Sequence, residues 1–254
     1  MNSFDSSSGC KACWRFESWA LLNDSLGGNT LTAFNTPAAE SLDYQEGSAC
    51  LRLKRDSAQY LAIADASLDA GFPLKLGDQI KQLTWAGWFQ TLSSSEQVLF
   101  CKSDLNRQSL ATILDNGTLR IEWGFNTGQS KEVFNCPGQV IPGQWYHLFL
   151  LVDGINRYLQ WSLYNAKTYG LQTCNFRPVN ELWVGNVDLY LGAAPDGRYF
   201  DGRLDETIVF QGIMPPAVQQ LIRLGLYGAD NPYIPNHPSP TEPAGWRWDQ
   251  HFWQ

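Results

Sequence analysis

Residues 143–165 constrain the fold more than any other stretch, because they have the pattern of two strands joined by a tight turn. The first strand, 145–152, is rich in aromatic and β-branched residues, and the Asp153-Gly154 pair after it is a hairpin signal. From 158 to 164, large apolar residues alternate with polar residues and tyrosines. This period of two is typical of a strand with one face on a core, so the stretch predicts an antiparallel β-hairpin.

Similar segments recur through the chain, with turn signals about every 8–12 residues. They cover residues 49–53, 60–63, 83–90, 98–101, 110–114, 119–125, 131–134, 189–191 and 202–210. Asn116-Gly117 marks a second hairpin between two of them. With 44% hydrophobic and 17% charged residues, the chain has enough apolar side chains for a sizeable core. The pattern predicts an all-β fold, an antiparallel sandwich of two sheets.

One helix is expected near the end of the chain. Pro215-Pro216 precedes residues 217–226, whose apolar residues form a helical stripe, and proline is favoured where a helix begins. The tail that follows is rich in proline and tryptophan. Because exposed tryptophans are costly, we expect the tail to dock on its own domain, with a partner as the alternative. The predicted parts are an N-terminal extension (1–12), one sandwich domain (13–227) and the tail (228–254).

The charge balance limits the partners. A net charge of −7 and a pI near 4.9 exclude nucleic acid, because binding a polyanion needs clustered lysine and arginine. An acidic surface suits a neutral partner or a divalent cation. The first ten residues have neither a basic start nor an apolar run, and the longest apolar run, 148–152, is too short for a membrane span. We therefore expect a soluble chain, cytoplasmic as synthesised, and either retained, exported by another route or associated with a particle.

The cysteines give a weak signal. Cys10 and Cys13 have the spacing of a metal or redox motif, but no second pair and no histidine pair accompanies them. Most cysteines are therefore expected to be buried thiols, with a local disulfide as the alternative. The six are Cys10, Cys13, Cys50, Cys101, Cys136 and Cys174.

Several segments resemble a known family in their order and spacing. They are residues 14–17 (WRFE), 24–29 (DSLGGN), 47–53 (GSACLRL), 84–89 (TWAGWF), 143–147 (GQWYH), 153–154 (DG) and 202–210 (GRLDETIVF). Over residues 13–227 the chain resembles the laminin-G-like, pentraxin-like branch of the concanavalin A-like lectin/glucanase superfamily. The resemblance implies a jelly roll of two curved antiparallel sheets with one short helix after the last strand.

The resemblance also implies binding rather than catalysis. Hydrolases of the superfamily carry Glu-x-Asp-x-x-Glu on one strand, and this chain lacks that spacing. Its nearest acidic cluster, Asp201, Asp205 and Glu206, lies on the wrong strand for that chemistry, in which two carboxyl groups flank the bond that breaks. His147 lies within an apolar strand and is expected to be a packing residue. We therefore predict that the chain is not an enzyme.

A structural Ca²⁺ is implied by the same resemblance. The family holds it with an aspartate of the last strand and with backbone carbonyls, and the matching positions here are Asp205, the region of Glu17, and Gly47. Carbonyl and carboxylate oxygens suit a hard cation. The alternative is that Asp205 caps a turn or pairs with Arg203.

Two places are expected to bind a ligand. Outward positions on three strands predict a groove with an aromatic residue for stacking on a sugar and polar groups for its hydroxyls. The groove residues are Trp88, Arg120, Glu122, Gln160 and Tyr164. The alternative for Trp88 is a place in the core. Loops 102–108 and 193–201 form the second place, with Arg198, Tyr199 and Asp201 as its ligand-binding residues.

Together these features predict a non-catalytic module that binds a glycan or a protein partner at a surface. The alternative is a structural or assembly protein of a phage-like particle or surface appendage, with a homo-oligomer formed through residues 228–254. A divergent glycoside hydrolase is the third and weakest hypothesis.

Overall fold

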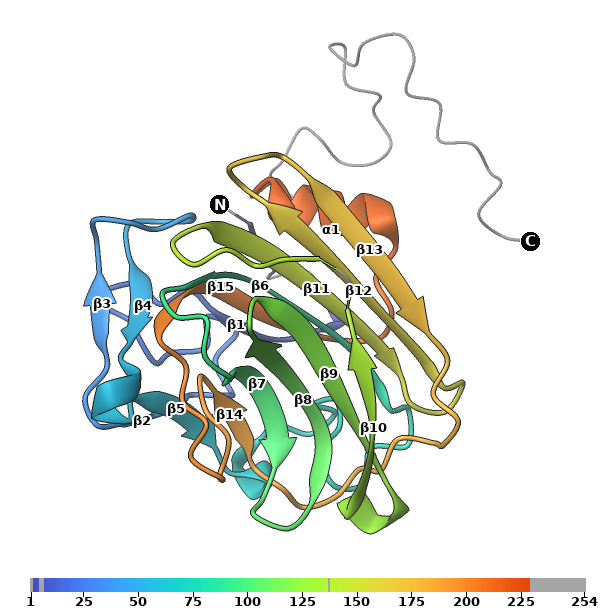
Figure 1. Cartoon of the computed structure of the whole chain (residues 1–254). Coiled ribbons are helices and arrows are strands. Elements are labelled where there is room, and N and C mark those ends of the chain that lie inside the picture. The colour runs from blue at the N-terminus through green and yellow to red at the C-terminus, as the bar shows by residue number, and fades with distance from the viewer. Residues whose placement is uncertain (1, 5–6, 137, 229–254) are drawn as a thin grey trace, which may run out of the picture.

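Two curved antiparallel sheets lie face to face in the computed structural model, which describes residues 2–4, 7–136 and 138–228 (Figure 1). Sheet A has the strand order β13-β12-β11-β6-β15-β4-β3, and β1 pairs with β15 beside this path. Sheet B has the order β10-β9-β8-β7-β14-β5-β2. The predicted all-β jelly-roll sandwich is therefore confirmed.

The strands of sheet A are β1 (Cys10–Trp14), β3 (Ala38–Glu40), β4 (Cys50–Leu53), β6 (Gln82–Thr91), β11 (Trp145–Asp153), β12 (Tyr158–Asn165), β13 (Leu171–Phe176) and β15 (Gly202–Gln211). Those of sheet B are β2 (Thr32–Phe34), β5 (Tyr60–Ile63), β7 (Gln97–Ser103), β8 (Gln108–Asp115), β9 (Thr118–Phe125), β10 (Ser130–Asn135) and β14 (Leu189–Leu191). The helix α1 (Pro216–Arg223) begins at a proline, as the sequence predicts. It is too short to cross a membrane, as is every other helix of the described residues.

Both predicted hairpins form, with different turns. Asn116 and Gly117 join β8 to β9 as a two-residue turn, and both have positive φ values of 48° and 74°. The turn between β11 and β12 is longer, since Asp153 pairs with Tyr158 across it. A Cβ on Gly154 would lie 2.8 Å from Cβ of Leu182, so close packing, rather than a tight turn, requires glycine there.

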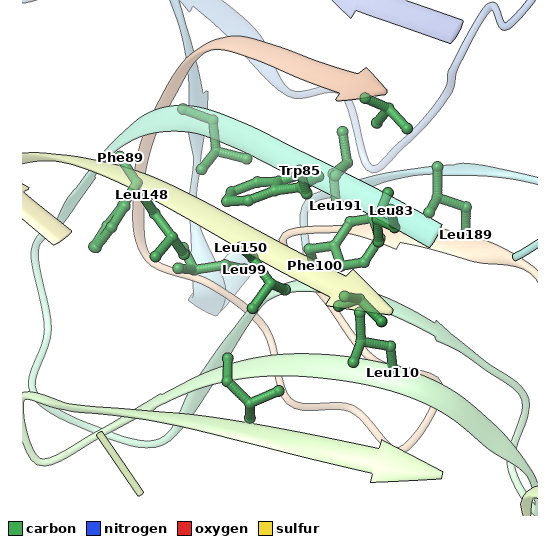
Figure 2. Packing of buried hydrophobic residues seen from close by; sticks show 14 of the residues in the cluster. Leu83, Trp85, Phe89, Leu99, Phe100, Leu110, Leu148, Leu150, Leu189 and Leu191 are labelled. Atoms are coloured by element: carbon green, nitrogen blue, oxygen red, sulfur yellow. The ribbon is translucent and has the colours of Figure 1, made fainter. Parts of the chain in front are cut away.

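The main core fills the space between the sheets. Figure 2 shows Trp85 of β6 among leucines of β11 and β14 and next to Phe100 of β7, with ring centroids of the two aromatic residues 5.7 Å apart. Alternate residues of β6 and β11 point into this core, as the period of two predicts. Their neighbours in sequence therefore point to the outer face of sheet A.

A second apolar cluster covers part of that outer face. Phe4, Cys10 and Cys13 pack there with Phe149 of β11 and with Ile222 of α1. Figure 1 shows α1 on the outside of the sandwich, on the same side as the N-terminus. This differs from the expected boundary at residue 13, because the described residues before it belong to the sandwich. The predicted docking of the tail concerns residues 229–254, which lie outside the described residues.

Strands β2, β3 and β13 are not anticipated by the sequence patterns, and β1 lies mostly within the expected N-terminal extension. β2 and β3 have three residues each, too few for a period to show. β13 is an edge strand with mostly exposed side chains, so its sequence lacks an apolar face. All six cysteines are free thiols, and five of them are buried, as expected for packing residues.

The buried pair Lys102–Asp65 gives a test of the fold. Both side chains are at most 2% exposed, and Lys102 Nζ also donates to the carbonyl of Val187 at 2.7 Å. We expect Lys102→Met to lower the free energy of unfolding by about 3–5 kcal/mol, because it leaves the Asp65 carboxylate buried without its cation. Urea denaturation measures this change.

The matched control is Lys81→Met, which breaks a pair whose Glu181 side chain is 57% exposed. Its expected cost is below about 1 kcal/mol. Equal costs for the two substitutions would contradict this account of the buried pair.

Candidate functional site

The outer face of sheet B carries a pocket of about 460 Å³, which we call the tyrosine pocket. Short strands β5 and β14 supply Tyr60 and Tyr190, and the chain after β14 returns across the sheet to supply Tyr199. The loop between β7 and β8 closes another side. The lining residues are Tyr60, Asp104, Leu105, Asn106, Tyr190, Ala194, Pro195 and Tyr199.

Small residues of the sheet make room for the returning chain. Register places Cys101 of β7 and Ala111 of β8 in one row with Tyr190, and both are fully buried. Ala194 packs on this row, and the thiol of Cys101 donates to the carbonyl of Ala193 at 3.3 Å. A larger side chain at either sheet position would push this segment away, so the small residues help to position Tyr199.

Arginine side chains fix the returning segment. Nε of Arg55 donates to the carbonyl of Tyr199 at 3.0 Å, and its NH2 group donates to the carbonyl of Glu96 at 2.9 Å. Arg198 pairs with Asp196 at 2.8 Å and with Glu96 at 3.1 Å. The aromatic wall at Tyr199 is thus held by hydrogen bonds on both sides, which favours a preformed site.

The three tyrosine rings form a shallow aromatic surface. The Tyr60 centroid lies 6.0 Å from those of Tyr190 and Tyr199, at interplanar angles of 39° and 33°. Phe34 stacks on Tyr60 at 4.4 Å and supports it. Within the described part of the chain, none of the three hydroxyl groups has a hydrogen-bond partner, so each can donate to or accept from a ligand.

The hydroxyls of Tyr60 and Tyr190 stay protonated at physiological pH. Burial raises the pKa of Tyr190 to about 12, with Asp188 adding to the effect, and burial also raises the pKa of Tyr60. A neutral phenol both donates and accepts a hydrogen bond, whereas a phenolate only accepts. The pocket therefore offers two-way hydrogen bonding.

The only acidic lining residue, Asp104, is already engaged. It accepts from the backbone N–H groups of Asn106 and Arg107, and Nε and NH2 of Arg107 donate to Oδ2 at 2.8 and 2.6 Å. Burial opposes ionisation, but these bonds outweigh it and lower the pKa of Asp104. Asp104 shapes the loop, while the exposed Asn106 amide has no side-chain partner among the described residues.

The structure separates the five residues predicted to form one groove. Arg120 and Glu122 lie on β9, on the outer face of sheet B, beside Arg198. The other three, Trp88, Gln160 and Tyr164, belong to sheet A on the opposite side of the sandwich. The single groove is therefore wrong as a geometric prediction.

Trp88 is only 6% exposed, which fits its alternative interpretation as a packing residue. Its ring packs edge-on against His147 at 4.7 Å and against Tyr164 at 6.2 Å. Arg223 of α1 lies over the Tyr164 ring at 4.4 Å, so the helix covers this part of sheet A. An indole enclosed in this way has no free face for a sugar.

Of the loop residues predicted as ligand-binding, Tyr199 lines the pocket and Arg198 stands next to it. Asp201 lies behind, where it pairs with Arg52 at 2.8 Å. Asn106 belongs to loop 102–108, which the sequence predicts as part of this second place without singling out a residue. Sequence reasoning missed Tyr60 and Tyr190. The two tyrosines occupy outward positions of short strands, a signal that period-two analysis contains, but their meeting depends on strand order.

Asp205, predicted as a calcium ligand, is fully buried and caps a loop. Its Oδ2 accepts from the backbone N–H groups of Gln45 at 2.7 Å and Glu46 at 2.9 Å, while Oδ1 has no partner among the described residues. Gly47 follows with a φ of 65°, and Glu17 accepts from Ser48 next to it. Burial raises the pKa of Asp205 to about 8.

This arrangement fits a cation only in part. One free carboxylate oxygen remains at Asp205, but two N–H groups occupy the side where carbonyl ligands are expected. In the part of the chain that the structure describes, no three His, Cys, Asp or Glu side chains meet as a metal cluster. Arg203 forms an ion pair with Glu40 at 2.6 Å, and not with Asp205.

His147 is enclosed between aromatic rings and makes no contact with the tyrosine pocket. It is 2% exposed, its Nδ1 has no partner among the described residues, and Phe149 lies at 4.8 Å. Burial lowers the pKa of His147 to about 3, and the Arg223 cation adds to this. The imidazole is neutral near pH 7, as expected for a packing residue.

This burial predicts a loss of stability in acid. The unfolded histidine binds a proton near its ordinary pKa of about 6.5, and the folded one does so only near 3, so stability present above 6.5 is lost as the pH falls towards 3. Between about pH 7 and about pH 4, we expect the free energy of unfolding of His147→Phe to fall by about 3 kcal/mol less than that of the wild type. Urea unfolding at a series of pH values measures it, and parallel curves for the two proteins would contradict it.

Comparison with known proteins places this fold. A family model described as the concanavalin A-like lectin/glucanases superfamily matches residues 55–217. No curated protein sequence matches the chain. Domain 4 of AbnA, a GH43 extracellular arabinanase from Geobacillus stearothermophilus, in complex with arabinotriose, is similar with a TM-score of 0.60 and 17% identity, covering 82% of this chain and 95% of that one.

Two toxin structures are also similar. The binding domain of botulinum neurotoxin serotype D gives a TM-score of 0.60 at 10% identity, covering 85% of this chain and 52% of that one. The binding domain of Paraclostridial Mosquitocidal Protein 1 gives 0.60 at 13%, with coverages of 85% and 52%. At these identities the likeness is one of fold, and this chain spans about half of each toxin domain. Since the family model covers more than half of the chain, the protein belongs to the concanavalin A-like lectin/glucanase superfamily.

Proposed function

We propose that this protein is a non-catalytic carbohydrate-binding module and that its site is the tyrosine pocket. One observation carries the proposal: three half-exposed tyrosine rings converge on a hollow, and their hydroxyls have no partner among the described residues. Sugars present apolar C–H faces and hydroxyl edges, which aromatic rings and neutral hydrogen-bonding groups match. The similar arabinanase domain was solved with arabinotriose, which supports a sugar as the class of ligand.

The pocket lacks the groups for glycoside hydrolysis. That reaction uses two carboxyl groups about 5–10 Å apart across the bond. Among the described residues that line the pocket, Asp104 is the one acid, and its carboxylate is bound by the side chain of Arg107. The acids Asp205 and Glu206 lie on the other sheet, where Asp205 caps the loop at Gln45 and Glu46 and Glu206 contacts Asn2 and Arg15. Binding without cleavage is the function that this geometry supports.

The test is a glycan array followed by calorimetry on the strongest ligand. We expect Tyr190→Ala to weaken binding at least about tenfold, equivalent to about 1.4 kcal/mol, because it removes both a ring and a hydroxyl from the lining of the pocket. Tyr190→Phe keeps the ring and is expected to lose less.

Tyr169→Ala is the matched control, because Tyr169 is 78% exposed and lies between β12 and β13 of the other sheet. It should leave binding unchanged. A blank array, or equal losses for Tyr190→Ala and Tyr169→Ala, overturns the assignment and favours a protein partner or an assembly role. The assembly hypothesis depends on residues 229–254, which lie outside the described residues.

We also propose a structural Ca²⁺ at Asp205, separate from the sugar site. The buried Oδ1 atom without a partner supports it, since a cation there would offset the cost of burying the charged carboxylate. We expect a chelator to lower the melting temperature by roughly 5–10 °C relative to saturating Ca²⁺. Asp205→Asn should remove this response. If the chelator leaves the melting temperature of the wild type unchanged, the proposed Ca²⁺ site is ruled out.

A further inference from the structure

The charged groups beside the tyrosine pocket are paired with one another. Arg198 uses its guanidinium nitrogens on Asp196 and Glu96, with contacts of 2.8 to 3.1 Å. Arg120 contacts Glu96 as well, and also Asp115 at 3.2 Å. Two cations on the outer face of sheet B therefore share the carboxylate of Glu96.

Two more cations of this face are also engaged. Lys131 pairs with Glu122 at 2.7 Å, and Arg107 pairs with Asp104 through two nitrogens. In all, four cations meet five carboxylates in these pairs: Arg107, Arg120, Lys131 and Arg198 with Glu96, Asp104, Asp115, Glu122 and Asp196. Arg55, which bonds to Tyr199 and Glu96, adds a fifth cation, so the positive and negative charges around the pocket balance.

Arg55 is the neighbouring cation without an acidic partner among the described residues. It is not among the lining residues, and its Nε and NH2 groups donate to the carbonyls of Tyr199 and Glu96. Its contacts hold the wall, so a ligand in the pocket meets tyrosine hydroxyls and the Asn106 amide before any free charge.

From these contacts we infer that the tyrosine pocket selects uncharged sugars and discriminates against sugars that carry a carboxylate or a sulfate. The inference rests on the proposed function. Recognition of a carboxylate normally uses an arginine that presents two N–H groups together. Here an acidic sugar would have to displace Asp104 or Glu96 from its arginine, which would leave a carboxylate unpaired.

The experiment compares matched pairs of oligosaccharides that differ by one acidic sugar or by acid groups: a galactose-terminated glycan with and without a terminal sialic acid, and a glucose oligomer with a glucuronic acid oligomer. We expect the neutral member of the bound pair to bind at least about tenfold more tightly. Its affinity should not change with salt concentration, since no free charge contributes.

Charge variants then test the cause. Asp104→Asn keeps an oxygen that accepts the loop N–H groups but releases Arg107, so it should raise the affinity for the acidic member several-fold relative to the neutral one, in a salt-dependent manner. Glu40→Gln is the control, because it removes the same charge from an ion pair on sheet A. Circular dichroism and melting curves confirm that each variant is folded.

The outcomes separate the two proposals. If the acidic member binds the wild type as tightly as the neutral one, and Tyr190→Ala abolishes both, the selectivity is overturned and the sugar site stands. If Asp104→Asn leaves the affinity for the acidic member unchanged, the ion pairs beside the pocket do not cause the selectivity, and the inference fails. If no sugar of either kind binds, the proposed function fails and the inference fails with it.

Discussion

The pairing of β6 with β11 supports the rest of this molecule. These strands run antiparallel from the pair Trp145–Gln90 to the pair Asp153–Gln82, and each is flanked by a further strand. Because every side chain on such a strand points to one face or the other, this register decides which residues enter the core and which reach the outer surface. A shift of one residue would turn Trp85 to the outer face and Trp88 into the core, so the fully buried Trp85 indole would lie outside.

The sequence predicted this framework well because period and turn chemistry are local properties. The bounds of β14 and the Asn116-Gly117 turn follow from a few adjacent residues, and the structure agrees with both. The site was less predictable. Alternation shows that Trp88 and Arg120 point outward from their strands, but it does not reveal that these strands belong to opposite sheets. Tyr60 and Tyr190 meet only because β14 pairs with β5, a contact between strands about 130 residues apart in sequence.

The two outer faces of the sandwich have different chemistry. On sheet A, α1 and the N-terminal segment cover apolar and aromatic residues, including His147. On sheet B, the segment after β14 packs over Cys101 and Ala111. The sheet surface beside these two residues forms the tyrosine pocket. On sheet B, the small residues Cys101 and Ala111 admit the covering segment, and Tyr199 at the end of that segment meets the ring of Tyr60.

The site therefore depends on loops anchored to a rigid scaffold. Arg55 and Arg198 hold the returning segment through backbone carbonyls and carboxylates, and Asp104 holds the facing loop through Arg107. None of these contacts is part of the core between the sheets, so substitutions in the loops can change the ligand without a large cost in stability. The ion pairs that fix the loops also neutralise Arg107 and Arg198, which lie beside the pocket. Rigidity and preference for an uncharged ligand are in this way two consequences of one set of contacts.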